Sequence, residues 1–279
     1  MLSAQVVAVV LLAAVLHAGW NVAVRAGSDR RRESLLLLGG GTLIAIVLLP
    51  FLPVPPLAAW PYLIVSSVLN GVFFILIAEA YAHGGVALAY PLMRGVAPMM
   101  TLFGAWLLLG EALPAAAWIG IATICGGVVL LSRRRGDAGE ATAVKFALMN
   151  AVVIATYTLN DSVGVRISRE PLAYTLWLYP LSSVPTILWL CRKTPSRRPT
   201  LRETMRGVAG AAASIGAYSM VLWAFTRAPV APVAALRETS ILIGVMLARL
   251  LLGEHPGRRG WAGAVAIATG AVILRLAPG

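Results

Sequence analysis

The chain has 279 residues, of which 59% are hydrophobic and 12% are charged, and its mean hydropathy is +0.84. Soluble domains usually carry about 25% charged and about 45–50% apolar residues, so this composition excludes an ordinary soluble enzyme and a disordered chain. A membrane-spanning helix needs about 20 apolar residues, so the length suffices for roughly ten spans joined by short turns. Little chain remains for a soluble catalytic domain.

The net charge of +12 comes from 23 Lys and Arg against 11 Asp and Glu. A single basic patch would favour nucleic acid binding. Here the positive residues form short clusters between apolar runs, as membrane topology requires. The sequence therefore predicts a lipid bilayer as partner and no nucleic acid. Cys125 and Cys191 lie in apolar segments without metal-ligand spacing, so no metal or cofactor site is predicted.

The apolar runs predict an all-α polytopic membrane protein with ten transmembrane helices. Gly, Pro and charged residues punctuate the connections between them, and loops this short make neighbouring helices antiparallel. The predicted helices lie at 5–24, 34–53, 57–82, 86–110, 113–132, 142–165, 172–191, 204–226, 231–252 and 260–276.

The positive residues divide unequally between the two sides of the membrane. Loops 1-2, 5-6, 7-8 and 9-10 share one side and hold fourteen Arg and Lys residues, whereas the other side holds four. Because cytoplasmic loops accumulate Lys and Arg, the Arg-rich loops are predicted to be cytoplasmic and both termini outside. The predicted location is a cell membrane of the bacterial inner-membrane type.

An internal repeat relates the two halves of the chain. The sequence Leu-Leu-Leu-Gly-Glu occurs at 107–111 and again 143 residues later, at 250–254. The same shift aligns Arg94 with Arg237 and Trp118 with Trp261. Five helices are an odd number, so the second half enters the membrane from the opposite side. We therefore predict two inverted five-helix repeats, at 1–135 and 140–279, with a binding site near the bilayer midplane between them.

Ten helices in two halves, with Gly110-Glu111 and Gly253-Glu254 each at the turn between a fourth and a fifth helix, resemble the drug/metabolite transporter superfamily, EamA branch. The resemblance covers essentially the whole chain. It implies a transporter whose central cavity is lined by helices 1, 3, 4, 6, 8 and 9, with helices 5 and 10 at the periphery. Members of the superfamily export amino acids, sugars, nucleotide-sugar precursors and other metabolites, so the resemblance does not define the substrate.

Arg94 and Arg237 are the strongest candidates for substrate binding. An ionisable side chain inside a span costs about 2.5–3.5 kcal/mol on insertion scales, and such residues are functional candidates by default. The repeat relates these two residues, and both follow prolines (Pro91; Pro229 and Pro232). Two guanidinium groups facing one cavity suit a carboxylate, phosphate or phosphonate. The alternative is that Arg94 pairs with Glu79 or Asp161, and Arg237 with another acid, only to neutralise buried charge.

Three acidic residues inside the spans are candidates for charge pairing or for proton coupling, because burial and neighbouring charges change the affinity of a carboxylate for a proton. They are Glu79, Asp161 and Glu238. Proton coupling would make transport depend on the proton gradient, and passive exchange is the alternative.

Polar residues on helices 1 and 6 form candidate cavity walls. His17 and Asn21 share a face of helix 1 beside Trp20, and Tyr157, Asn160 and Asp161 lie at similar depth in helix 6. These positions correspond in the repeat, although less closely than under the 143-residue shift. An interhelical hydrogen bond is the simpler role for His17. Tyr90 and Tyr218 are further candidates for the substrate pathway.

Two repeated features are predicted to be structural. Glu111 and Glu254 each follow a Gly at a turn, where a carboxylate is solvated or caps the next helix. Gly120 with Gly127, and Gly263 with Gly270, have i,i+7 spacing that permits close helix packing, within the bundle or in a dimer. 

The sequence lacks a Gly-rich phosphate loop, an HExxH motif and a Cys/His ligand set, so no enzyme is predicted. We expect a secondary transporter that exports a small anionic or zwitterionic metabolite, such as an organic acid, amino acid or phosphonate, by alternating access. One alternative is an exporter of hydrophobic cations, which two buried Arg residues oppose. Another is a membrane partner that does not transport, or a subunit of a lipid-carrier flippase.

Overall fold

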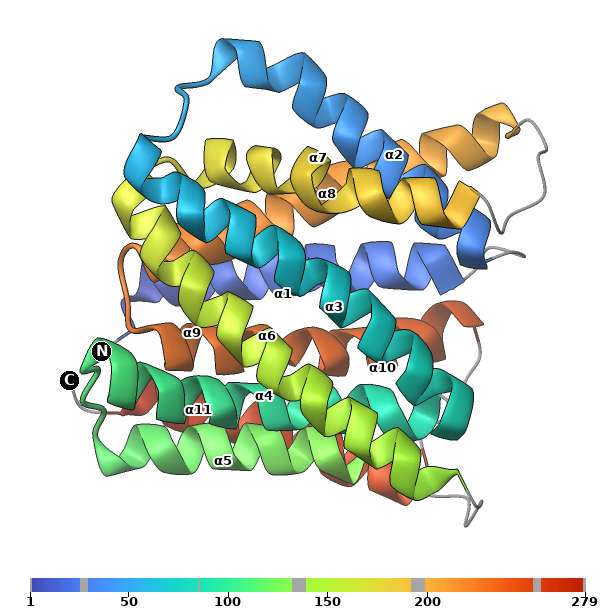
Figure 1. The fold of residues 1–279 in the computed structure, drawn as a ribbon. Coiled ribbons are helices and arrows are strands. Elements are labelled where there is room, and N and C mark those ends of the chain that lie inside the picture. Colours follow the sequence, from blue (N-terminus) through green and yellow to red (C-terminus); the bar gives the residue numbers. More distant parts are fainter. Residues whose placement is uncertain are drawn as a thin grey trace.

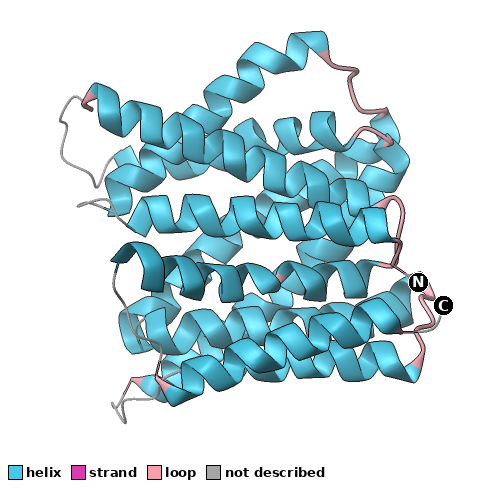
Figure 2. Ribbon diagram, turned by 180° about the vertical axis from the view of Figure 1, so that it is seen from behind, coloured by secondary structure: helices cyan, strands magenta, loops and turns pink. Residues whose placement is uncertain are grey.

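The computed structural model describes residues 2–25, 30–84, 86–131, 139–191, 199–252 and 257–277. Within these ranges the regular secondary structure is entirely helical, as the apolar runs predict. Both termini lie at one end of a bundle whose helices run along its length (Figure 1 and, from behind, Figure 2).

The first half contains five long helices and two short 3-10 turns, Leu49–Phe51 and Leu57–Ala59. Its helices are α1 (Ala4–Arg25), α2 (Arg30–Leu48), α3 (Trp60–Gly84), α4 (Val86–Leu109) and α5 (Ala115–Leu130). The second half contains α6 (Glu140–Ser168), α7 (Pro171–Cys191), α8 (Leu201–Phe225), α9 (Val230–Arg237), α10 (Thr239–Leu252) and α11 (Arg258–Leu276).

The second half corrects one prediction about the helices. The ninth segment, predicted as one helix at 231–252, is broken after Arg237 into the eight-residue α9 and the 14-residue α10, with Glu238 between them. Its counterpart α4 contains Pro91 and Pro98 and nevertheless runs unbroken. Pro98 lies in the middle of α4 and does not break it, so prolines alone do not decide where the chain breaks.

Seven of the described helices are long and apolar enough to cross a membrane, and α5 is a shorter apolar helix of 16 residues. Many of their large apolar side chains face outward, among them Phe103, Trp106, Leu107 and Leu108 on α4. Outward-facing apolar surface of this extent is expected where hydrocarbon chains rather than water surround the bundle.

The contacts between helices show the inverted symmetry of the two halves. The repeat equates α1 with α6 and α3 with α8, and accordingly α3 packs along α6 while α1 packs along α8. The equivalent helices α5 and α11 pack against each other, as do α2 with α7 and α4 with α9. These self-paired contacts are those expected on either side of a pseudo-twofold axis.

Glycines bring α5 and α11 into backbone contact. A Cβ atom added at Gly127 would lie 2.8 Å from the carbonyl oxygen of Gly263, and one at Gly270 would lie 2.7 Å from that of Gly120. Gly120 and Gly127 thus face Gly270 and Gly263 in antiparallel order. The i,i+7 glycines pack within the bundle, which is one of the two arrangements predicted from their spacing.

Glu111 joins the halves at the end of the bundle that holds the termini. Its Oε2 accepts a hydrogen bond from the backbone N–H of Val230 at 2.8 Å, and its Oε1 lies 3.2 Å from Nη2 of Arg166. Arg166 in turn donates to the carbonyl oxygen of Phe225 at 2.8 Å. Glu111 therefore caps α9 of the other half, not the next helix as predicted. Its repeat counterpart Glu254 lies outside the described residues.

The close approach of α5 and α11 gives a direct test with a matched control. We expect Gly127→Ala to lower the free energy of unfolding by about 1–3 kcal/mol, because the new methyl group would overlap a backbone carbonyl. The neighbouring Gly126→Ala has no atom within 4 Å of its added Cβ and should be nearly neutral. Thermal unfolding in detergent measures both, and equal stability of the two variants would contradict this packing.

Candidate functional site

The break between α9 and α10 places two charged residues in the interior of the bundle. Arg237 is the last residue of α9 and Glu238 is its C-terminal cap, and every residue of α9 is buried. Arg237 is 7% exposed and Glu238 is 2% exposed. The break lies between α9 and α10, so both residues lie inside the ninth segment and not at either of its ends.

An ion pair joins this break to the other half. Nη2 of Arg94 on α4 lies 2.8 Å from Oε1 of Glu238, and Arg94 is 7% exposed. The structure thus pairs Arg94 with Glu238 and not with Glu79 or Asp161. The ion pair connects α4 of the first half to the C-terminal cap of α9 in the second half. The repeat makes these two helices equivalent.

Arg237 lies beside this pair without a partner of its own among the described residues. Its charge acts on both Glu238 and Asp161. Its Nε is buried without a hydrogen-bond partner, and the same holds for Nε of Arg94 and Oε2 of Glu238. Buried polar atoms of this kind cost free energy unless they are paired. The cluster therefore keeps donors and an acceptor available for a ligand.

Asp161 on α6 forms a second, adjoining cluster. The hydroxyl groups of Ser66 on α3, Tyr174 on α7 and Tyr218 on α8 all donate to its carboxylate, Tyr174 at 3.0 Å. We call these three residues the hydroxyl cluster. Asn160 supports it by donating to the hydroxyl of Ser66 at 2.8 Å and to the carbonyl oxygen of Tyr62 at 2.7 Å.

The polar residues of α1 lie near the arginines. The charges of Arg94 and Arg237 both act on His17, whose ring meets that of Trp20 edge to face at 5.2 Å. Nδ2 of Asn21 donates to the carbonyl oxygen of His17 at 2.7 Å. That bond lies within α1, so Asn21 does not form an interhelical bond through this group.

Two further predicted residues lie in the neighbourhood of Arg94. Tyr90 on α4 and Tyr157 on α6 both lie near it, and both are half-buried. Tyr157 also packs edge to face against Phe73 at 6.5 Å between ring centroids. The structure therefore brings together Arg94, Arg237, Glu238, Asp161, His17, Tyr90, Tyr157 and Tyr218.

Glu79 is the predicted residue that the structure separates from this group. Its side chain is 49% exposed and lies 3.9 Å from Nδ1 of His83, near the end of α3. Glu79 lies late in the predicted span at 57–82, which agrees with its distance from the central group.

Sequence reasoning missed Ser66 and Tyr174, which complete the hydroxyl cluster. Ser66 is one of two adjacent serines in an apolar helix, and Tyr174 lies near a helix start, where aromatic residues usually anchor at the membrane interface. Neither position carries a signal that distinguishes it. Only the packing of α3 and α7 against α6 brings the two residues to Asp161.

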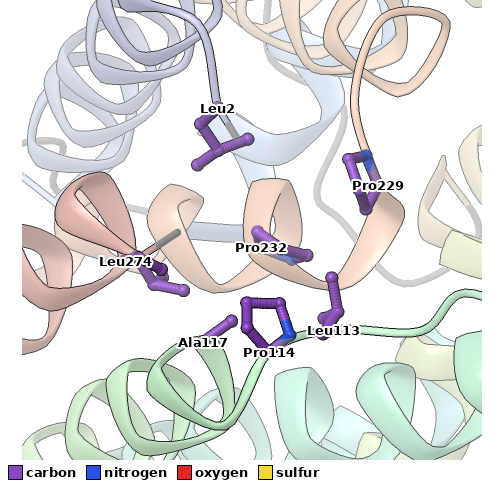
Figure 3. A pocket seen from close by; sticks show the side chains of 8 residues that line it. Leu2, Leu113, Pro114, Ala117, Pro229, Pro232 and Leu274 are labelled. Carbon is purple, nitrogen blue, oxygen red and sulfur yellow. The ribbon is translucent and has the colours of Figure 1, made fainter. Parts of the chain in front are cut away.

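A small hollow at the end that holds the termini does not extend this site. It has a volume of about 30 Å³ and is lined by apolar residues, among them Leu2, Pro114, Pro229 and Leu274 (Figure 3). Such a space holds about one water molecule and offers no charged group. Among the described residues there is also no group of three or more side chains suited to a metal ion.

Comparison with protein families matches the chain twice, at residues 5–133 and 141–276, to the EamA-like transporter family. The chain belongs to that family. It is therefore a multi-pass membrane protein of a transporter family, as the resemblance of its sequence implies. No curated protein matches the sequence.

Solved structures support the fold. In all, 29 chains match, and one of them, titled "Crystal structure of protein", superimposes with a TM-score of 0.76. That match covers 97% of this chain and 96% of the other at 18% sequence identity. At this identity the likeness shows a shared fold and says nothing about the substrate.

The ion pair between Arg94 and Glu238 predicts a specific pattern of stability. We expect Glu238→Gln to lower the free energy of unfolding by about 3–5 kcal/mol, because it leaves a buried guanidinium uncompensated. The double variant Arg94→Gln with Glu238→Gln should recover part of that loss. Glu79→Gln is the control, since the half-exposed carboxylate should change stability by less than about 0.5 kcal/mol. Thermal unfolding in detergent would contradict the pairing if the double variant were no more stable than Glu238→Gln.

Proposed function

We propose that this EamA-family protein is a secondary transporter that exports a small anionic or zwitterionic metabolite. The observation that supports the proposal most is Arg237, a buried guanidinium at a helix break that has no ion-pair partner among the described residues. A charged group is costly inside a membrane protein and tends to be retained where it pairs or binds a ligand. Because Glu238 pairs with Arg94, Arg237 is the group available to a substrate.

The balance of charge supports an anion or a zwitterion over a cation. Arg94, Arg237 and Glu238 together carry two positive charges and one negative charge, so this cluster favours a carboxylate, phosphate or phosphonate. The buried Oε2 of Glu238 also lacks a partner and could accept a hydrogen bond from the ammonium group of a zwitterion. An exporter of hydrophobic cations would need an acidic group that no guanidinium opposes.

The inverted architecture supports alternating access as the mechanism. The proposed site lies where α4 and α9, equivalent helices of the two halves, face each other. We propose that the halves, residues 1–135 and 140–279, rock against each other around this site and expose it to each side in turn. His17, Asn21, Tyr90, Tyr157, Asn160 and Tyr218 would then contact or orient the substrate.

Transport by reconstituted protein tests this function. Vesicles containing the protein should take up at least one of radiolabelled succinate, glutamate, alanine and methylphosphonate faster than protein-free vesicles. Arg237→Gln should lower that rate about tenfold or more, because hydrogen bonds to charged groups contribute about 1.5–3 kcal/mol. Absence of transport for every compound would reject the proposal.

Arg227→Gln is the matched control for this test. Arg227 lies over the ring of Trp223 at 4.6 Å, beyond the end of α8, and is not part of the site. The Arg227→Gln variant removes the same charge as Arg237→Gln but outside the site. Its transport rate should therefore equal that of the unaltered protein. The folded yield of Arg237→Gln should also be nearly unchanged, and a loss of folding would favour a purely structural role.

The orientation that we propose has the Arg-rich loops in the cytoplasm and both termini outside. The two termini lie at the same end of the bundle (Figure 1). A C-terminal alkaline phosphatase fusion should therefore be active in bacterial cells, because that enzyme folds only outside the cytoplasm. An inactive phosphatase fusion, together with a fluorescent C-terminal fusion to green fluorescent protein, would show the opposite orientation.

A further inference from the structure

Asp161 has a different environment from the buried acids Glu238 and Glu33. It is fully buried and makes no ion pair with any described residue. Glu238 pairs with Arg94, and Glu33 pairs with Arg206 at 2.7 Å. Asp161 instead receives hydrogen bonds from the three neutral groups of the hydroxyl cluster. A carboxyl group in such surroundings can exist in either protonation state without losing an ionic partner.

The hydroxyl cluster ties one carboxylate to three helices. Ser66 and Tyr174 donate to Oδ1, and Tyr218 donates to Oδ2, so α3, α7 and α8 all meet α6 at this point. A proton bound to either carboxylate oxygen turns that oxygen from an acceptor into a donor. The hydroxyl group that donated to that oxygen must then rotate to accept, or the hydrogen bond is lost. Protonation would therefore change contacts among four helices that move when the halves rock.

A looser alignment of helices 1 and 6 than the 143-residue shift places the carboxylate in one half only. When Tyr157 and Asn160 are aligned with His17 and Trp20, Asp161 falls on Asn21 of α1. Asn21 is an amide of nearly the same shape and cannot bind a proton in the physiological range. A role limited to packing would be served by the amide, so the asymmetry favours a function that needs an ionisable group.

Charged and titratable groups face Asp161 from each helix packed around it. Tyr174 on α7 and Tyr218 on α8 donate to it, Tyr62 on α3 interacts with Tyr174, and the charge of Arg237 on α9 acts on Asp161. Tyr218 also interacts with both Asp161 and Arg237. The carboxylate and the guanidinium proposed to bind substrate are thus neighbours.

We propose that Asp161 is the proton-binding site of this transporter and that it binds its proton together with the anionic substrate. The proposal rests on the function proposed above. An ionised Asp161 offsets the positive charge of Arg237, whereas a protonated Asp161 leaves that charge for the substrate. Water on one side gives up the proton to the carboxylate, and the carboxyl group releases it to water on the other side after the halves have moved.

Thermodynamic linkage makes the effect reciprocal. If a proton on Asp161 strengthens anion binding, then a bound anion must strengthen proton binding by the same factor. The proton and the anion are therefore carried in the same direction. An excess of the metabolite inside the cell would drive both outward.

An infrared titration of the reconstituted protein tests the proton site without a transported compound. The protein in lipid vesicles should show a carboxylic acid carbonyl band that grows as the pH falls from about 8 to about 5. Asp161→Asn should remove that band, whereas Glu79→Gln, as the control, should leave it in place. In Arg237→Gln the carboxylic acid band should appear at higher pH, because the variant lacks a positive charge that opposes protonation of Asp161. A band that persists in Asp161→Asn would overturn the proposal.

Methanesulfonate tests the linkage to the anion, because it keeps its single negative charge throughout this pH range. Saturating methanesulfonate should move the band of the unaltered protein to higher pH, and its binding should tighten by up to about tenfold per pH unit on acidification. Asp161→Asn, which resembles the protonated state, should bind it with the same affinity at every pH. A band that does not respond to methanesulfonate would overturn the coupling.

The two proposals can fail separately. If no compound of the transport panel crosses the membrane but the band responds to methanesulfonate, the transport function is rejected and the proton site stands. If transport is found but the band does not depend on Asp161, the proton site is rejected and the transport function stands. Vesicles in which a sodium gradient replaces the proton gradient and drives uptake equally well would also reject the proton site.

Discussion

The structure depends on holding two guanidinium groups, Arg94 and Arg237, inside the bundle beside the buried acids Glu238 and Asp161. Burying a charge costs free energy, and for Arg94 this cost is offset by Glu238 on the other half of the chain, whose Oε1 lies 2.8 Å from Nη2 of Arg94. A buried ion pair of this kind adds little net stability, but loss of one partner is costly. The pair therefore fixes how α4 and the broken ninth segment face each other, and Arg237 lies beside it without an ion pair to any described residue.

The contact of α5 with α11 supplies the frame in which this charge is held. Backbone approaches backbone at Gly120 with Gly270 and at Gly127 with Gly263, and these pairs are exchanged by the repeat. At the end of the bundle with the termini, Glu111 caps α9 and pairs with Arg166. The half-helix that ends in Arg237 is thus attached to the first half at both of its ends, through Glu111 at its start and through Arg94 at its end.

Much of the fold could be predicted from the sequence, because hydrophobic runs and the 143-residue repeat report directly on spans and symmetry. The break after Arg237 could not, since α4 carries comparable prolines and remains continuous. Sequence also indicated that Arg94, Arg237 and Glu238 were important but not which acid pairs with which base. Periodicity defines a face of one helix, whereas partners such as Ser66 and Tyr174 depend on how different helices pack.

The central claim is that Arg237 binds an anionic group between the two halves. The most direct measurement is an experimental structure of the protein in lipid with methylphosphonate bound. The account predicts density for the phosphonate within hydrogen-bond distance of the Arg237 guanidinium, with the ion pair between Arg94 and Glu238 alongside it. Phosphonate density elsewhere, or an Arg237 side chain that points toward lipid headgroups, would contradict the account.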